Sequence, residues 1–166
     1  KTRTKENLTK PLGVVATDLQ GGEPVVFRTG NTGMAVRASS SVPGVFQPVT
    51  ISGREYVDGG LVSPVPVRAA RAMGADLVIA VYISSNPRLG KTKDSVDVML
   101  QTFAIMGQSI AGFELPEADV VIRPDMTRIR STNFEDRHLA IIEGERAGLA
   151  ASVAIQPKIA EKTLSR

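Results

Sequence analysis

The sequence contains no cysteine and no tryptophan among its 166 residues, and it has a single histidine. Without cysteine, disulfide bonds, thiol catalysis and cysteine-ligated metal sites are excluded, but this absence does not separate the cytoplasm, which we favour, from the periplasm. No run of about 18 apolar residues occurs, so the sequence predicts no membrane-spanning helix. Phosphate-binding glycine loops, paired histidines and calcium-type acidic loops are also missing. We therefore expect no metal and no cofactor.

Aromatic residues make up 4% of the chain, and the formal net charge is only +3. Nucleic-acid binding is not expected, because it needs a stronger basic surface and more stacking side chains. Four basic residues cluster near the start of the chain, at Lys1, Arg3, Lys5 and Lys10. These charges suit either a transient contact with anionic lipid head groups or an exposed, solvated connection.

Short apolar segments alternate with helical patterns along the chain, whose hydrophobic content of 42% is enough for one core. Strands are predicted at 13–17, 24–28, 77–83 and 118–122, and helices at 34–39, 68–73, 95–113 and 136–154. We expect Gly74 to cap the helix before it, a loop at 86–90, and Pro157 close to the end of the last helix. Strands that alternate with helices are typical of a largely parallel sheet, so the predicted fold class is α/β.

The stretch Val57-Asp58-Gly59-Gly60 places one carboxylate between an extended segment and two glycines. Taken alone, Asp-Gly after extended residues is a strong signal for a tight hairpin turn. The neighbouring sequence favours another structure, because a helix end broken at Pro43 comes before this stretch, and Pro64 and Pro66 introduce a helix after it. We therefore place Asp58 at a junction between elements and predict that it is a catalytic carboxylate.

Several short segments around Asp58 form an ordered and specific pattern. They are Leu12-Gly13-Val14-Val15-Ala16-Thr17-Asp18-Leu19, Ala38-Ser39, Pro43, Val45-Phe46-Gln47-Pro48, Tyr56-Val57-Asp58-Gly59-Gly60, Pro64, Pro66 and Gly74-Ala75-Asp76-Leu77-Val78-Ile79-Ala80-Val81. This pattern resembles the second half of a bacterial patatin-like phospholipase domain, firmly in the first half of the chain and more weakly beyond residue 90. The resemblance implies a three-layer α/β/α fold with a largely parallel sheet, of which residues 1–166 are the C-terminal part.

The resemblance also implies a lipid acyl hydrolase that works with a serine and an aspartate and needs no cofactor. Asp58 matches the aspartate of that family, which activates the serine and takes its proton. Gly59 and Gly60 would provide the close backbone approach that only glycine permits. Phospholipids, lysophospholipids and simple esters all stay open as substrates.

The serine of that family lies in a Gly-x-Ser-x-Gly turn before the aspartate, and this sequence has no such pentapeptide. The nearest match, Gly107-Gln108-Ser109-Ile110-Ala111-Gly112, has one residue too many and comes after Asp58. Gly21-Gly22 is better explained as a hairpin connection than as an oxyanion loop. Since the chain also starts at Lys1 in a basic stretch, we expect an N-terminal segment of the same domain to carry the serine. This segment is either retained beside the chain or absent from it.

Two alternatives concern the nucleophile and its partners. His138 follows Asp58 in the aspartate-then-histidine order of α/β-hydrolases, so it is either a triad member or an ordinary polar residue in the first turn of a helix. The missing serine turn is also what a non-catalytic scaffold or interaction module would show. An upstream Gly-x-Ser-x-Gly would favour the enzyme over the module.

Two further patterns concern lipid binding. Phe103, Ile105 and Met106 either line a pocket for an acyl chain or face the sheet as part of the core. Arg128 and Arg130 either bind phosphate head groups or lie in a solvated loop.

Overall fold

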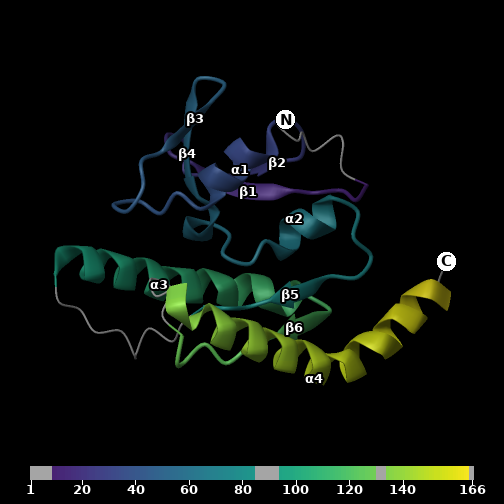
Figure 1. Ribbon diagram of the computed structural model, residues 1–166. Helices are drawn as coiled ribbons and strands as arrows, with labels where there is room; N and C mark the ends of the chain where they lie inside the picture. Colours follow the sequence, from purple (N-terminus) through teal and green to yellow (C-terminus); the bar gives the residue numbers. More distant parts are fainter. Residues whose placement is uncertain (1–8, 85–93, 130–133, 165–166) are drawn as a thin grey trace.

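The computed structural model describes residues 9–84, 94–129 and 134–164. In chain order, its elements are β1 (Val14–Asp18), β2 (Pro24–Phe27), α1 (Thr32–Ser39), β3 (Val49–Ile51), β4 (Arg54–Asp58), the 3₁₀ helix η2 (Gly59–Leu61), α2 (Val67–Ala72), β5 (Ile79–Val81), α3 (Ser95–Glu114), η4 (Leu115–Glu117), β6 (Val120–Ile122), η5 (Phe134–Asp136) and α4 (Arg137–Leu164). Figure 1 shows β1 to β4 with α1 in the upper part, and α3, α4, β5 and β6 in the lower part. In the described part of the chain, no helix has the length and apolar character to cross a membrane.

The larger sheet is antiparallel, which differs from the largely parallel sheet that we predicted. Its strand order is β2-β1-β4-β3, and each neighbouring pair is antiparallel. Short connections explain the pairs β1–β2 and β3–β4, because a parallel pair needs a long crossover. The turn Ser52-Gly53 joins β3 to β4 with positive φ angles of 52° and 80°, which is the geometry of a two-residue hairpin. β3 has no counterpart among the strands predicted from the sequence.

Parallel pairing is present where the chain does make a long crossover. β5 pairs in parallel with β6, and α3 lies between them in the sequence. The predicted α/β class is therefore confirmed, with helices, strands and a parallel pair. The hairpin connection predicted at Gly21-Gly22 is also present, since it joins the antiparallel strands β1 and β2 and Gly22 has a φ of 74°.

Each strand and helix predicted from the sequence has a counterpart, with shifted bounds. The largest difference is α4, which was expected to end near residue 154 and instead runs through Pro157 to Leu164. Proline removes one hydrogen bond and bends a helix without always ending it. The good helix formers after Pro157 let the helix resume, and Figure 1 shows α4 curved along its C-terminal part.

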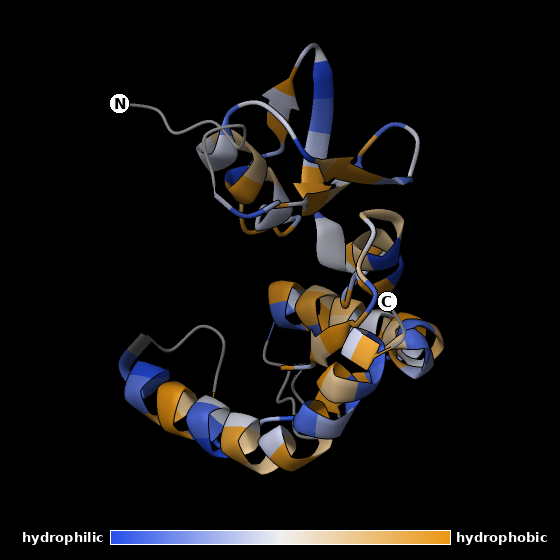
Figure 2. Cartoon of the chain, turned by 90° about the vertical axis from the view of Figure 1, so that its right-hand side faces the viewer, coloured by the Kyte–Doolittle hydropathy of each residue, from blue (hydrophilic) through white to orange (hydrophobic). Residues whose placement is uncertain are grey.

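Two small cores hold the described elements together. One packs α1 on the larger sheet through Ala16, Ala38, Val49 and Tyr56. The other joins α2, β5 and α3 through Val65, Val67, Val78, Ala80, Ala111 and Leu115. Much apolar surface stays outside these cores, and the hydropathy colours of Figure 2 show apolar residues along both α3 and α4.

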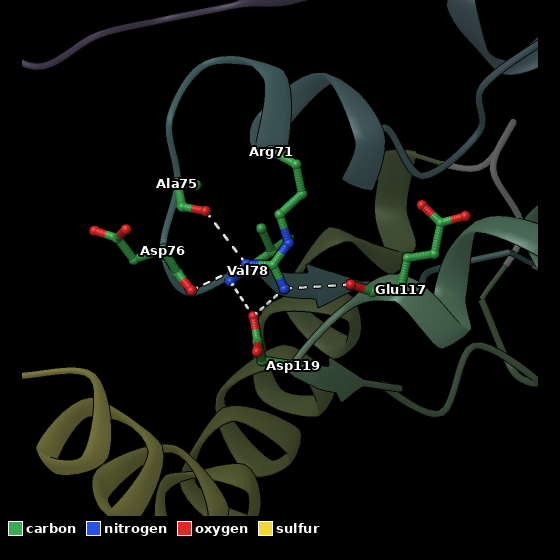
Figure 3. A network of polar contacts seen from close by, with 6 residues as sticks. All are labelled: Arg71, Ala75, Asp76, Val78, Glu117 and Asp119. Carbon is green, nitrogen blue, oxygen red and sulfur yellow. Dashed lines mark hydrogen bonds and ion pairs between the residues drawn. The ribbon is translucent and has the colours of Figure 1, made fainter. Parts of the chain in front are cut away.

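Arg71 in α2 connects the starts of β5 and β6 (Figure 3). Its guanidinium donates to the backbone carbonyls of Ala75 and Asp76 at 3.2 and 3.0 Å, and to Oδ2 of Asp119 at 2.5 Å. The same Oδ2 accepts the Val78 N–H at 2.7 Å. Asp119 therefore fixes the register at which β5 and β6 begin.

We expect Asp119→Asn to lower the free energy of unfolding by about 2 kcal/mol at pH 7, because it weakens charge-assisted hydrogen bonds. The Val78 hydrogen bond, followed by Arg71, lowers the pKa of Asp119 below its usual 3.8. The stability from the carboxylate is thus present above pH 3.8 and is lost as the pH falls through the lower pKa of the folded state. Urea unfolding at pH 7 and pH 3 measures both effects.

The matched control is Glu117→Gln, which removes an ion pair with Arg68 in which both side chains are exposed. Such a pair contributes about 0–1 kcal/mol. Equal losses for Asp119→Asn and Glu117→Gln would contradict the role given to Asp119.

Candidate active site

Asp58 is the last residue of β4 and the N-cap of η2. Its Oδ1 accepts the backbone N–H of Gly60 at 2.7 Å, which is the usual way in which an aspartate caps a helical turn. The chain therefore passes from a strand directly into a helical turn at Asp58. The predicted junction is confirmed, and the tight hairpin at Asp-Gly is excluded.

The backbone of Asp58 is held from two directions. Its N–H donates to the carbonyl of Ser41 at 3.0 Å, and its carbonyl accepts the Thr17 hydroxyl at 2.7 Å. Ser41 is buried just after α1, where its own hydroxyl donates to the Arg37 carbonyl at 2.7 Å. β1, β4 and the end of α1 thus converge on Asp58. Sequence reasoning missed Thr17 and Ser41 as supports, because nothing local marks which backbone group a hydroxyl will reach.

Gly59 allows this convergence because it lies directly against β1. A Cβ atom at Gly59 would lie 2.4 Å from the Val15 carbonyl oxygen, which is far inside van der Waals contact. A Cβ at Gly60 would lie 2.9 Å from Oδ1 of Asp58. The structure thus has the expected close backbone approach at Gly59, whereas Gly60 lies close to the Asp58 side chain.

The Asp58 carboxylate is half-buried, and one of its oxygens stays available. Desolvation raises the pKa of Asp58 above its usual range, and the Gly60 hydrogen bond acts in the opposite direction. Among the described residues, Oδ2 of Asp58 accepts no hydrogen bond. A partly desolvated carboxylate with a free oxygen is suited to accept a proton from a neighbouring hydroxyl.

Asp18, at the end of β1, shows the opposite environment. Its Oδ1 accepts the N–H groups of Gln20 and Gly21 at 3.0 Å each, and its Oδ2 pairs with Arg54 at 2.6 Å. The Gly21 hydrogen bond makes the largest contribution to a lowered pKa. Oδ1 holds the β1–β2 turn and Oδ2 joins β1 to Arg54 at the start of β4, so both oxygens are engaged and Asp18 is structural. Of the two aspartates, Asp58 has the environment that suits proton transfer.

Two other candidates from the sequence lie in helices. Ser109 is in the interior of α3, where its exposed hydroxyl donates to the Ile105 carbonyl at 3.3 Å. It is not on a strand-to-helix turn, which agrees with its irregular spacing. His138 is exposed in the first turn of α4, and the described structure shows no hydrogen bond between it and Asp58.

The residues predicted to bind lipid are not gathered into a pocket. Phe103 is half-buried, whereas Ile105 and Met106 are 51% and 52% exposed, and none of the three belongs to either core of the described structure. Arg128 is exposed in a turn, while Arg130, the loop 86–90 and the basic residues Lys1, Arg3 and Lys5 lie outside the described residues.

An open pocket of about 280 Å³ lies elsewhere, between the end of β1 and the loop after α1. Its lining residues are Leu19, Pro43, Gly44, Val45, Phe46, Gln47, Pro48 and Val57. The segment from Pro43 to Pro48 belongs to the sequence pattern described above, but no pocket was predicted there.

The family model described as patatin-like phospholipase matches residues 5–71, a segment that includes Asp58 and both glycines. Over 134 residues, or 76% of the chain, the sequence is 34% identical to the mouse protein named patatin-like phospholipase domain-containing protein 6. The chain belongs to the patatin-like phospholipase family.

Mycobacterial relatives of this patatin-like chain cover different shares of it. An uncharacterized NTE family protein of Mycobacterium tuberculosis is 39% identical over 90 residues, which is 54% of the chain. A second one from the same organism is 28% identical over 179 residues and covers 93% of the chain. The chain spans only 25% and 30% of these two proteins, and 9% of the mouse protein.

Proposed function

We propose that this chain is the aspartate-bearing, C-terminal part of the catalytic domain of a lipid acyl hydrolase of the phospholipase A or esterase type. In it, Asp58 forms a dyad with a serine. The observation that carries the proposal is the Asp58 carboxylate, which has a raised pKa, a fixed backbone and one oxygen without a hydrogen bond in the described structure. Phospholipids, lysophospholipids and simple esters all fit this chemistry.

In the proposed reaction, Asp58 takes the proton of the serine hydroxyl as the serine oxygen bonds to the carbonyl carbon of the ester. The tetrahedral intermediate then expels the alcohol, which receives that proton from Asp58. Water attacks the acyl-serine in the same way, giving up a proton to Asp58, and the serine recovers a proton as the fatty acid leaves. The raised pKa of Asp58 supports both directions of transfer.

We further propose that the serine lies in a Gly-x-Ser-x-Gly turn on an N-terminal segment of the same domain. Exposed apolar surface in the described part supports a segment packed there: Phe113 on α3 is 74% exposed, and Val153 on α4 is 79% exposed. β5 and β6 form a sheet of only two strands, which is marginal by itself. The chain matches only 25% and 30% of the length of the two mycobacterial relatives, which leaves room in them for such a segment.

A fluorophosphonate probe tests the proposal in the complete natural protein. We expect it to label one serine on a peptide upstream of Lys1, and Asp58→Asn to slow the labelling strongly, because the serine then lacks its base. Mass spectrometry of the labelled peptides identifies the site. Failure to label any serine in the folded protein would favour the non-catalytic scaffold or interaction module.

A further inference from the structure

Glu114, in the last turn of α3, is a buried carboxylate outside the site described above, with 5% of its surface exposed. Its Oε1 accepts the Ser63 hydroxyl at 2.8 Å. Its Oε2 is also buried and has no hydrogen-bond partner among the described residues. Arg68 interacts with it electrostatically, but the Arg68 guanidinium hydrogen-bonds to Glu117 instead.

The stability of the fold does not explain why the Glu114 carboxylate is buried. An unsatisfied buried acceptor costs about 1–3 kcal/mol, and an apolar side chain would pack at this position without that cost. Glutamate is also among the residue types that are least often buried. The Ser63 hydrogen bond therefore points to a role in holding the segment that contains Ser63.

That segment is the turn that follows Asp58. The N–H groups of Val62 and Ser63 both donate to the Gly59 carbonyl, at 3.2 and 2.9 Å, which closes 59–63 into one hydrogen-bonded unit. The Gly60 N–H in this unit holds the Asp58 carboxylate.

α3 meets this unit a second time, about two helical turns before Glu114. A Cβ atom at Gly107 would lie 3.9 Å from the Gly60 carbonyl oxygen, so the helix backbone passes close to the turn. Glu114 thus anchors one end of a contact that runs along α3 and beside the turn after Asp58.

We propose that Glu114 is a positioning residue for Asp58. Through Ser63 it fixes the unit 59–63 against α3, and through the Gly60 N–H it fixes the direction of the Asp58 carboxylate. This inference rests on the proposed function, in which the Asp58 oxygen must lie within hydrogen-bond reach of the serine.

The kinetic test compares Ser63→Ala, Glu114→Met and the double variant in the complete protein. We expect each to lower kcat about 10-fold with KM changed less than about 2-fold, because a small misplacement of a catalytic group mainly costs rate. The double variant falls no further, since both changes break the same hydrogen bond. Glu114→Gln keeps an oxygen for Ser63 and restores most of kcat.

Two control variants accompany these changes. Glu117→Gln alters an exposed carboxylate one turn further along the chain, and Ser109→Ala removes an exposed hydroxyl on α3, so both keep kcat unchanged. Counting active sites with the fluorophosphonate corrects every rate for misfolded protein. Additive losses in the double variant, or a change in KM alone, would overturn the proposal.

Hydrogen–deuterium exchange separates this inference from the proposed function. If Glu114 holds the turn, the Gly60 amide exchanges at least about 10-fold faster in Ser63→Ala and Glu114→Met than in the wild type, whether or not the protein hydrolyses esters. Unchanged exchange at Gly60 in both variants would overturn the positioning role, even in an active enzyme. Absence of hydrolysis in the wild type would instead contradict the proposed function.

Discussion

Asp58→Asn is expected to lower kcat/KM for ester hydrolysis by about 10³-fold in the complete protein, because the serine loses its general base. The amide oxygen can still accept the Gly60 N–H, so the turn keeps its shape. Hydrolysis of a short chromogenic ester, measured on protein of verified fold, gives the ratio. Glu55→Gln is the matched control, because Glu55 is exposed on the same strand. We expect this variant to keep the wild-type kcat/KM.

The pH dependence sharpens this expectation. A general base must be ionised, so kcat/KM rises as the pH rises through the pKa of Asp58. Because burial raises this pKa, the rise in kcat/KM occurs above the usual carboxyl value of 3.8. An Asn variant that retains more than about a tenth of the activity, with the same acidic limb, would exclude Asp58 as the base.

Asp58→Asn is expected not to destabilise the protein near pH 7, whereas loss of a merely structural aspartate would destabilise it. Because burial raises the folded-state pKa of Asp58, its protonated form favours folding below pH 3.8, and this contribution is lost as the pH rises through the raised pKa. Near pH 7, Asp58→Asn should therefore unfold at the same temperature as the wild type or slightly above it. Asp119→Asn is expected to unfold at a lower temperature than the wild type near pH 7, since the pKa of Asp119 is lowered.

The sequence predicted the position of Asp58 from local signals. Pro43 before it and Pro64 and Pro66 after it rule out a continuous hairpin, and the structure has a strand ending at Asp58 with a helical turn after it. The contacts that hold Asp58 were not predictable in this way. Thr17 lies 41 residues away, and no periodicity or turn signal records which strands become neighbours.

Glu114 and Ile105 show that the sequence does not predict which side chains of α3 are buried. A glutamate at the end of an amphipathic helix is expected in solvent, yet Ser63 draws Glu114 into the interior. Ile105 is expected either to line an acyl-chain pocket or to face the sheet as part of the core, yet it is exposed in the described structure. Helical periodicity identified α3 correctly, but which of its faces is covered depends on segments that are distant in the sequence.

Gly59→Ala is expected to destabilise the fold by about 3 kcal/mol and to abolish hydrolysis, because its methyl group would overlap the backbone of β1. The Cβ would lie 2.4 Å from the Val15 carbonyl oxygen and 2.9 Å from the carbonyl carbon. A flexible side chain could move away, but these atoms belong to a strand paired on both sides, with β2 and β4. Thermal unfolding and urea unfolding measure the loss.

Gly112→Ala is the matched control for this change. Gly112 is in the last turn of α3, and apart from the backbone of the helix itself, a Cβ there has no atom within 4 Å. The same substitution should then stabilise the protein by about 0.5–1 kcal/mol, because alanine favours a helix over glycine. Opposite signs at the two glycines would show that Gly59 is required by contact with β1 and not by backbone freedom. Since this contact also sets where β4 ends, the cost of alanine at Gly59 measures how firmly the fold places Asp58.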